Sequence, residues 1–273
     1  MSTNVERRTA SRILFVSLVF LSIAGRASAQ GDLTIFVGSA YPVYDERLTL
    51  RPSVPSLPGA DVTVSGSPKI TANGGLVVGG ALAFEAGVLG IEGRIDSTAV
   101  AFDLTGARYD VRASSGPFQG LTGSVTVGDG QFDADRFQLL SINARLRTPG
   151  PICLVVSGGF SYLPNITITG SVPLSAEVAG FPIVSNIAPR LRLEVAPGES
   201  EHRFGVNGGA GLRIGGSRVA LMGEVRVFYF REYELRFNVA DAPPVVEDLL
   251  EGLDPVRFEP VIVNAQAGLV FRF

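Results

Sequence analysis

The feature that most constrains the fold is a set of eight segments, each about ten residues long, in which apolar and polar side chains alternate. Successive side chains of a β-strand point to opposite faces of a sheet, so each segment predicts a strand with one apolar face. About ten residues is also the length of a strand that crosses a bilayer at a tilt. The segments are 32–41, 75–85, 88–98, 138–147, 151–162, 202–214, 217–230 and 261–273.

The connections between these segments alternate between short and long. The short ones lie around Ala86-Gly87, at "TPGP" (148–151) and at Gly215-Gly216, where glycine and proline favour tight turns. The long ones are 42–74, 99–136, 163–200 and 231–258. This pattern predicts an all-β fold, an eight-stranded antiparallel up-and-down transmembrane β-barrel with turns at one end and loops at the other. An alternative of ten strands follows if 102–112 continues the third strand and a hairpin is added within 99–136.

The first 29 residues are typical of a cleaved signal peptide. Arginines precede the apolar run "ILFVSLVFLSIAG", and the small residues Ala27-Ser28-Ala29 follow it. We expect cleavage after Ala29, which leaves 30–273 as the outer-membrane β-barrel domain. Removing residues 1–29 takes away four arginines and one glutamate, so the net charge falls from −3 to −6. An acidic mature chain argues against a nucleic-acid partner.

Alternation alone does not say which face of the barrel is inside. A soluble lipocalin-like barrel would bury its apolar face, whereas a membrane barrel turns that face to lipid. The polar faces here are rich in Gly, Ala and Ser, which suits a narrow lumen, and aromatic residues fall near strand ends, as in the girdles of membrane barrels. These observations and the export signal favour a membrane barrel. The predicted aromatic girdle comprises Tyr41, Phe84, Tyr162, Phe204, Tyr229 and Tyr233.

If the apolar faces meet lipid, the polar faces line the lumen. Eight strands leave room mainly for side chains, so we expect a lumen filled by ion pairs and hydrogen bonds. The predicted luminal polar cluster is Glu85, Glu92, Arg94, Asp96, Asn143, Arg145, Asn207, Glu224, Arg226, Asn264 and Gln266. Four arginines at the turn ends of strands predict a basic rim that faces the periplasm, exposed to water or to anions: Arg147, Arg213, Arg218 and Arg272.

The signal peptide, the eight strands, the alternation of turns and loops, and the ending "AGLVFRF" together resemble the small bacterial outer-membrane β-barrel family of the OmpA/OmpX type. In that family a C-terminal aromatic residue with apolar residues at every second position before it is read by the barrel-assembly machinery. The matching positions are Ala267, Leu269, Phe271 and Phe273. The resemblance implies a Gram-negative outer-membrane location, with both termini on the periplasmic side.

The expected role is structural, or an interaction of the long loops with an extracellular ligand; the expected partners are outer-membrane lipid and the assembly machinery. A porin-like channel for small solutes or ions is the alternative. A lipid-modifying enzyme would need a base, for which His202 is the sole histidine, and the sequence offers no partner residues for it. We therefore expect no catalytic site, no cofactor and no metal site.

Overall fold

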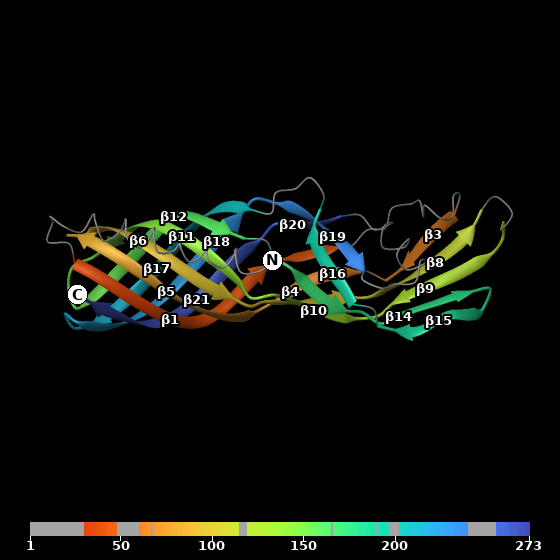
Figure 1. Ribbon diagram of the computed structural model, residues 1–273, viewed down its shortest axis with the longest axis horizontal. Coiled ribbons are helices and arrows are strands. Elements are labelled where there is room, and N and C mark those ends of the chain that lie inside the picture. The colour runs from red at the N-terminus through yellow and green to blue at the C-terminus, as the bar shows by residue number, and fades with distance from the viewer. Residues whose placement is uncertain are drawn as a thin grey trace, which may run out of the picture.

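The computed structural model describes residues 30–47, 60–66, 68–114, 119–164, 166–188, 190–196, 202–239 and 255–273. The predicted signal peptide, 1–29, lies outside the described residues. No helix in these ranges is long and apolar enough to cross a membrane. The molecule is elongated, with three successive β-structures along its long axis (Figure 1).

The first structure is a closed antiparallel barrel of eight strands, in the order β1-β21-β18-β17-β12-β11-β6-β5. The predicted fold class is therefore confirmed, with eight strands rather than ten. The strands are β1 (Gln30–Val43), β5 (Gly75–Ala86), β6 (Leu89–Thr98), β11 (Phe137–Arg147), β12 (Ile152–Leu163), β17 (Arg203–Gly215), β18 (Val219–Phe230) and β21 (Val261–Arg272).

The first and last barrel strands pair along their whole length. The register runs from Asp32 opposite Arg272 to Val43 opposite Val261. Beyond it, the Gly31 N–H donates to the Phe273 carbonyl at 3.0 Å, and the Phe273 N–H donates to the Gly31 carbonyl at 2.9 Å. The terminal residue thus belongs to the closure of the barrel, which leaves no sheet edge between β1 and β21.

A second, eight-stranded sheet, here called the middle sheet, continues the barrel strand by strand. Each barrel strand is followed or preceded by one of its strands, in the same neighbour order, but β2 and β20 at its two ends are not paired with each other. The Tyr44 hydroxyl bridges these ends by donating to the Arg257 carbonyl at 2.8 Å. The strands are β2 (Asp45–Arg47), β4 (Lys69–Asn73), β7 (Ala101–Thr105), β10 (Gly130–Ala134), β13 (Ile168–Ser171), β16 (Arg190–Val195), β19 (Tyr233–Val239) and β20 (Val256–Phe258).

A third, five-stranded sheet, here called the distal sheet, lies at the end of the molecule farthest from the barrel (Figure 1). Its order is β15-β14-β9-β8-β3. Ala179 and Gly180, both with positive φ, form the two-residue turn between β14 and β15, as tight hairpins require. The strands are β3 (Ala60–Ser65), β8 (Ala107–Ala113), β9 (Thr122–Val127), β14 (Leu174–Val178) and β15 (Phe181–Ile187).

The four long connections are therefore not loops in the usual sense, because much of each is strand. Sequence periodicity missed them since the apolar positions change phase along the chain. In β6 the outward, exposed residues are odd-numbered (Ile91 and Ile95), whereas in β7 the buried ones are Phe102 and Leu104. Where a chain passes from the barrel to the middle sheet, its apolar side chains move from the outer face to the inner face. The alternation of apolar and polar residues in the sequence is therefore interrupted at that point. The expectation that 102–112 continues the third strand agrees with β7 and β8, without adding strands to the barrel.

Candidate functional site

The half of the lumen nearest the turns holds a buried polar network. All eleven residues predicted for the luminal cluster are at most 7% exposed. They are joined by Asp32, Ser141, Ser157, Ser161 and Arg213, which are also buried. The sequence prediction missed Asp32 because it lies at the very start of the first strand, where the alternation is weakest.

Arg226 lies at the centre of this network and is fully buried. Its guanidinium donates to Glu224 at 2.6 and 3.0 Å and to Glu92 at 3.0 Å. It also donates to the Ser157 hydroxyl at 2.6 Å and to the Asn207 side-chain oxygen. Four strands, β6, β12, β17 and β18, are thereby tied together across the lumen, and each of these charges has an opposite charge beside it.

A glycine on the neighbouring strand leaves space for the side chains of Arg226 and Glu224. Gly209 faces the lumen on β17, and a Cβ atom built there would lie 2.5 Å from Glu224 Oε1 and 3.2 Å from Arg226 Nε. The many small residues on the polar faces therefore have a steric reason: they make space for long charged side chains from the neighbouring strand.

Arg94 forms a second centre, closer to the middle sheet. It donates to Asp96 at 2.7 and 2.9 Å and to Glu224 at 2.8 Å. Its guanidinium carbon also lies 4.0 Å from the centre of the Phe36 ring, in cation–π geometry. Arg94 thus stands where the polar part of the lumen meets an apolar part.

The predicted basic rim is wrong for three of its four arginines. Arg272 donates to both oxygens of Asp32 at 2.8 and 3.1 Å, Arg213 donates to the same carboxylate at 3.1 Å, and Arg147 lies 3.1 Å from Glu85. All three reach into the lumen and share two buried carboxylates, those of Asp32 and Glu85, so they line the turn end of the lumen instead of forming an open cationic collar. Arg218 is exposed.

Arg145, also near the turn end of its strand, completes this cluster. Its guanidinium lies 3.5 Å from Glu85, 3.7 Å from Glu92 and 4.0 Å from Asp32. In this part of the described lumen five carboxylates therefore face six guanidiniums: Asp32, Glu85, Glu92, Asp96 and Glu224 against Arg94, Arg145, Arg147, Arg213, Arg226 and Arg272.

The part of the lumen nearest the middle sheet is lined mainly by apolar side chains. Inward-facing side chains from the barrel join those of the middle sheet in one buried cluster, here called the plug. Its barrel members include Phe36, Ala40, Val77, Leu139, Leu163, Phe228, Phe230 and Ile262, and its middle-sheet members include Ile70, Phe102, Leu104, Phe132, Ile168, Leu193, Leu235 and Phe258. Phe132, Phe228 and Phe230 are fully buried. The plug fills the passage between the polar lumen and the distal end.

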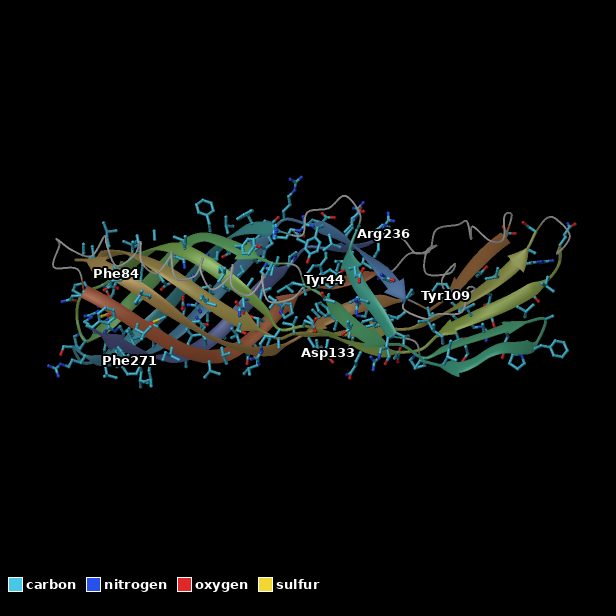
Figure 2. The ribbon with its side chains drawn as sticks, viewed as in Figure 1. Tyr44, Phe84, Tyr109, Asp133, Arg236 and Phe271 are labelled. Atoms are coloured by element: carbon cyan, nitrogen blue, oxygen red, sulfur yellow. The ribbon has the colours of Figure 1, made fainter. Side chains whose placement is uncertain are left out.

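The outside of the barrel carries an apolar belt. Its exposed side chains come from all eight strands and include Ile35, Leu76, Ile95, Ile142, Leu154, Val206, Leu221 and Leu269, each at least 40% exposed. The residues matched to the C-terminal assembly signal, Ala267, Leu269, Phe271 and Phe273, all lie on this outer face. Figure 2 shows Phe271 on the barrel.

Of the six predicted girdle residues, five lie on the outer face and one does not. Tyr41, Phe204 and Tyr229 are exposed, and Phe84 and Tyr162 are half-buried. The placement of Tyr233 in the girdle is wrong: it is 3% exposed, packs against Phe258 in the plug, and has the Arg203 guanidinium 4.2 Å from its ring centre. The chain changes phase between β18 and β19, which turns Tyr233 inward. Burial raises the pKa of its phenol well above the usual range.

Above the belt the polarity of the wall reverses. The middle sheet buries apolar side chains and turns polar ones outward, with Arg192 beside Glu194 at 3.4 Å and Asn238 donating to Glu194 at 3.0 Å. Figure 2 shows Arg236 on the same sheet. The barrel is thus polar inside and apolar outside, and its continuation is apolar inside and polar outside. A reversal of this kind is expected where an apolar medium around a protein gives way to water.

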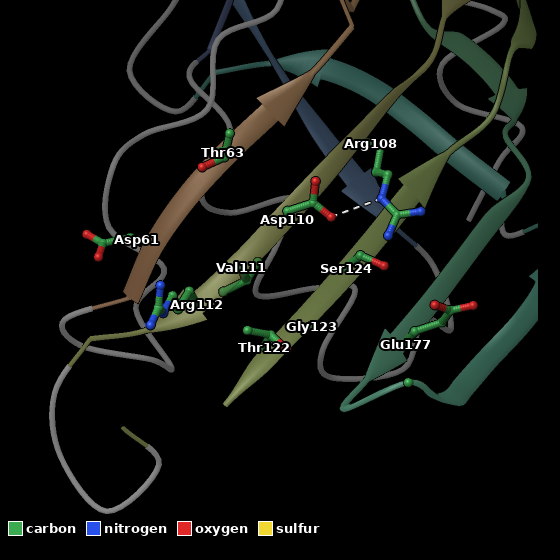
Figure 3. Close-up of a pocket in the computed structure, with 11 residues that line it drawn as sticks. Asp61, Thr63, Arg108, Asp110, Val111, Arg112, Thr122, Gly123, Ser124 and Glu177 are labelled. Atoms are coloured by element: carbon green, nitrogen blue, oxygen red, sulfur yellow. Dashed lines mark hydrogen bonds and ion pairs between the residues drawn. The ribbon is translucent and has the colours of Figure 1, made fainter. Parts of the chain in front are cut away.

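The distal sheet has an apolar face and a polar face. Tyr109, Leu174 and Ala176 are buried on the first, and burial raises the pKa of the Tyr109 phenol. The polar face lines a pocket of about 620 Å³ that four strands form, β3, β8, β9 and β14 (Figure 3). In one cross-strand row of the pocket Asp110 lies opposite Ser124, and Ser124 opposite Glu177.

Charges of both signs line this pocket. In the next row Asp61 lies opposite Arg112. Arg108 donates to Asp110 at 2.9 Å, as drawn in Figure 3, and this hydrogen bond together with the Asp110 charge raises the pKa of Arg108. Sequence patterns offered no reason to connect these residues, because they come from segments that were predicted to be loops.

The described residues include no group of three or more His, Cys, Asp or Glu side chains that could hold a metal ion. His202 is exposed at the rim of the barrel, where its Nδ1 lies 2.6 Å from the Tyr162 hydroxyl. Cys153 is buried, with its thiol 2.7 Å from the Gly150 carbonyl.

No protein-family model matches the chain, and no curated protein matches its sequence. Among solved structures, the chain is similar to the crystal structure of a major outer membrane protein from Thermus thermophilus. The two are 12% identical, with a TM-score of 0.39, over 89% of this chain and 99% of that chain.

Proposed function

We propose that the protein is an integral outer-membrane β-barrel with a sealed lumen, which holds the middle and distal sheets outside the cell for a structural or surface-interaction role. The observation that carries the proposal is the reversal of polarity along the wall. A soluble barrel has no physical reason to expose an apolar belt around eight strands while it buries nine charged side chains.

The dimensions of the belt fit the proposed location. β21 has twelve residues, and at about 3.3 Å per residue and a tilt near 45° such a strand spans roughly 28 Å. That matches the apolar band of outer-membrane barrels. The exposed Tyr41 and Tyr229 then lie at one lipid–water boundary, and Phe271 and Phe273 at the other.

The same reasoning supports an orientation. In outer-membrane barrels tight turns face the periplasm and long excursions face outward. Both described chain ends, Gln30 and Phe273, would lie at the periplasmic side, and the distal sheet would lie outside the cell. The lipid-facing C-terminal pattern supports the assembly machinery as a partner during biogenesis. No catalytic role is part of the proposal.

The alternative of a porin-like channel rests on the polar half of the lumen and is opposed by the plug. Fully buried phenylalanines and paired charges leave ions no hydrated route. We therefore expect the purified, refolded protein to produce no steady conductance steps in planar lipid bilayers at either polarity. A known porin, inserted under the same conditions, serves as the positive control. Reproducible unitary steps from the protein itself would favour the channel.

A further inference from the structure

The distal pocket is built from the polar face of a sheet whose apolar residues point the other way. Its three carboxylates, two guanidiniums and several hydroxyls come from side chains at alternate positions on four strands. Val111 is the one large apolar side chain among its described lining residues. A volume of about 620 Å³ lies within the range of small-ligand sites, but an apolar ligand would find few contacts there.

The charged groups of the pocket are already partly satisfied by one another. Arg108 and Asp110 form an ion pair at 2.9 Å, with side chains 53% and 44% exposed. A charged ligand would have to compete with one member of this pair for the other. A hydroxyl group faces no such competition, because it donates to the carboxylate and accepts from the guanidinium while the pair stays intact.

Hydroxyl side chains extend the same chemistry across the pocket. Thr63 and Ser124 lie on either side of Asp110 in the cross-strand row that ends at Glu177. Facing residues in such a row have Cβ atoms about 4.5–5.5 Å apart. The row thus presents donors and acceptors in alternation, on a scale that suits a ligand with several adjacent hydroxyl groups.

We propose that the distal pocket binds an uncharged polyhydroxylated ligand, in chemical class a saccharide. The proposal deepens the surface-interaction role and rests on the proposed function in one respect, that the distal sheet is outside the cell. The saccharide has two sources with the same chemistry: free oligosaccharides of the medium, and the polysaccharide of the cell's own envelope.

The test uses the full-length protein in detergent micelles on an array of neutral, anionic and cationic oligosaccharides, with purified envelope polysaccharide as a further probe. We expect binding to neutral glycans, and a loss on the order of tenfold or more when R108Q and D110N are combined. The matched control combines R192Q and E194Q, which removes an equally exposed ion pair, 3.4 Å apart, outside the pocket. The control should change affinity less than about twofold.

Binding of neutral glycans that the pocket variant weakens and the control variant does not would support the proposal. Competition between free oligosaccharide and envelope polysaccharide would then identify the source. Absence of binding to every neutral glycan, a preference for charged ones, or equal loss in both variants would overturn it. Because the assay is done in micelles, its result is independent of whether the barrel conducts or where it is inserted.

Discussion

Replacing Arg226 with methionine is expected to destabilise the folded barrel by about 3–5 kcal/mol, enough to remove most of the folded form from membranes. Arg226 is fully buried, and its guanidinium contacts the carboxylates of Glu92 and Glu224 at 2.6–3.0 Å. Methionine is also long and unbranched but carries no charge, so these carboxylates would lose their closest partner in a lumen that offers little water. The measurement is the folded fraction by heat-modifiable migration, together with denaturant unfolding in micelles.

Two further variants make this prediction specific. Arg192→Met removes an arginine whose side chain is 58% exposed and paired with Glu194, and it should cost less than about 1 kcal/mol. Adding Glu92→Gln to Arg226→Met removes one of the two carboxylates that lose their contact with Arg226, and we expect it to recover at least about 1 kcal/mol. A loss for Arg226→Met no larger than that for Arg192→Met would mean that the lumen is hydrated and its ion pairs are dispensable.

Placing arginine at Val225 is expected to destabilise the barrel by about 2–4 kcal/mol. Val225 is 53% exposed and lies near the middle of β18, on the apolar belt. If the belt contacts lipid, the guanidinium has to enter hydrocarbon or distort the bilayer. If the belt contacted water, a surface valine-to-arginine change would be nearly neutral. The variant therefore discriminates between a membrane barrel and a soluble one by stability alone, measured by unfolding in lipid vesicles.

The control for Val225→Arg is Asn238→Arg on the middle sheet. Asn238 is exposed and donates to Glu194, a contact that arginine would also make. We expect a change within about 0.5 kcal/mol. Equal destabilisation by both variants would show that the cost is not caused by lipid.

The barrel could be predicted from sequence because lipid imposes a strict rule. Outward positions in lipid must be apolar, so each barrel strand keeps its own alternation of period two, as Leu33, Ile35 and Val37 do in β1. The charged residues of the lumen could be predicted because they occupy the alternate positions of the same strands. Closure followed from the requirement that no backbone group stays unpaired in lipid, and β1 does pair with β21.

The plug could not be predicted in the same way, because the alternation that identified the barrel assigns polar residues to the inward positions, and the plug residues at these positions are apolar. Phe36, Phe228 and Ile262 sit at lumen-facing positions, where a filled polar interior was expected, and their apolar character looks like noise in the alternation. Their meaning depends on apolar side chains such as Phe102 and Phe132, which meet them only after the middle sheet has formed. Contacts of this kind are tertiary, and no local period encodes them.

The remaining differences between prediction and structure concern residues whose contacts come from other strands. Arg213 and Arg272 sit at strand ends, which predicts exposure, but both reach the carboxylate of Asp32. Arg272 and Asp32 are opposite each other in the β1–β21 register, and only the closed barrel creates that neighbourhood. The distal pocket depends likewise on pairing between β3, β8, β9 and β14, and of these only β8 falls in a stretch, 102–112, that the sequence suggested as strand.

In the proposed placement, lipid surrounds the barrel up to the level where the polarity of the wall reverses. Spin labels test this in reconstituted vesicles, attached through Ile142→Cys on the belt and through Thr169→Cys on the middle sheet, with Cys153→Ala removing the native thiol. Collision rates with oxygen, which partitions into lipid, and with a water-soluble nickel complex report the surroundings of each label. We expect high oxygen and low nickel accessibility at position 142 and the reverse at position 169. High nickel accessibility at both positions would contradict a lipid-facing belt.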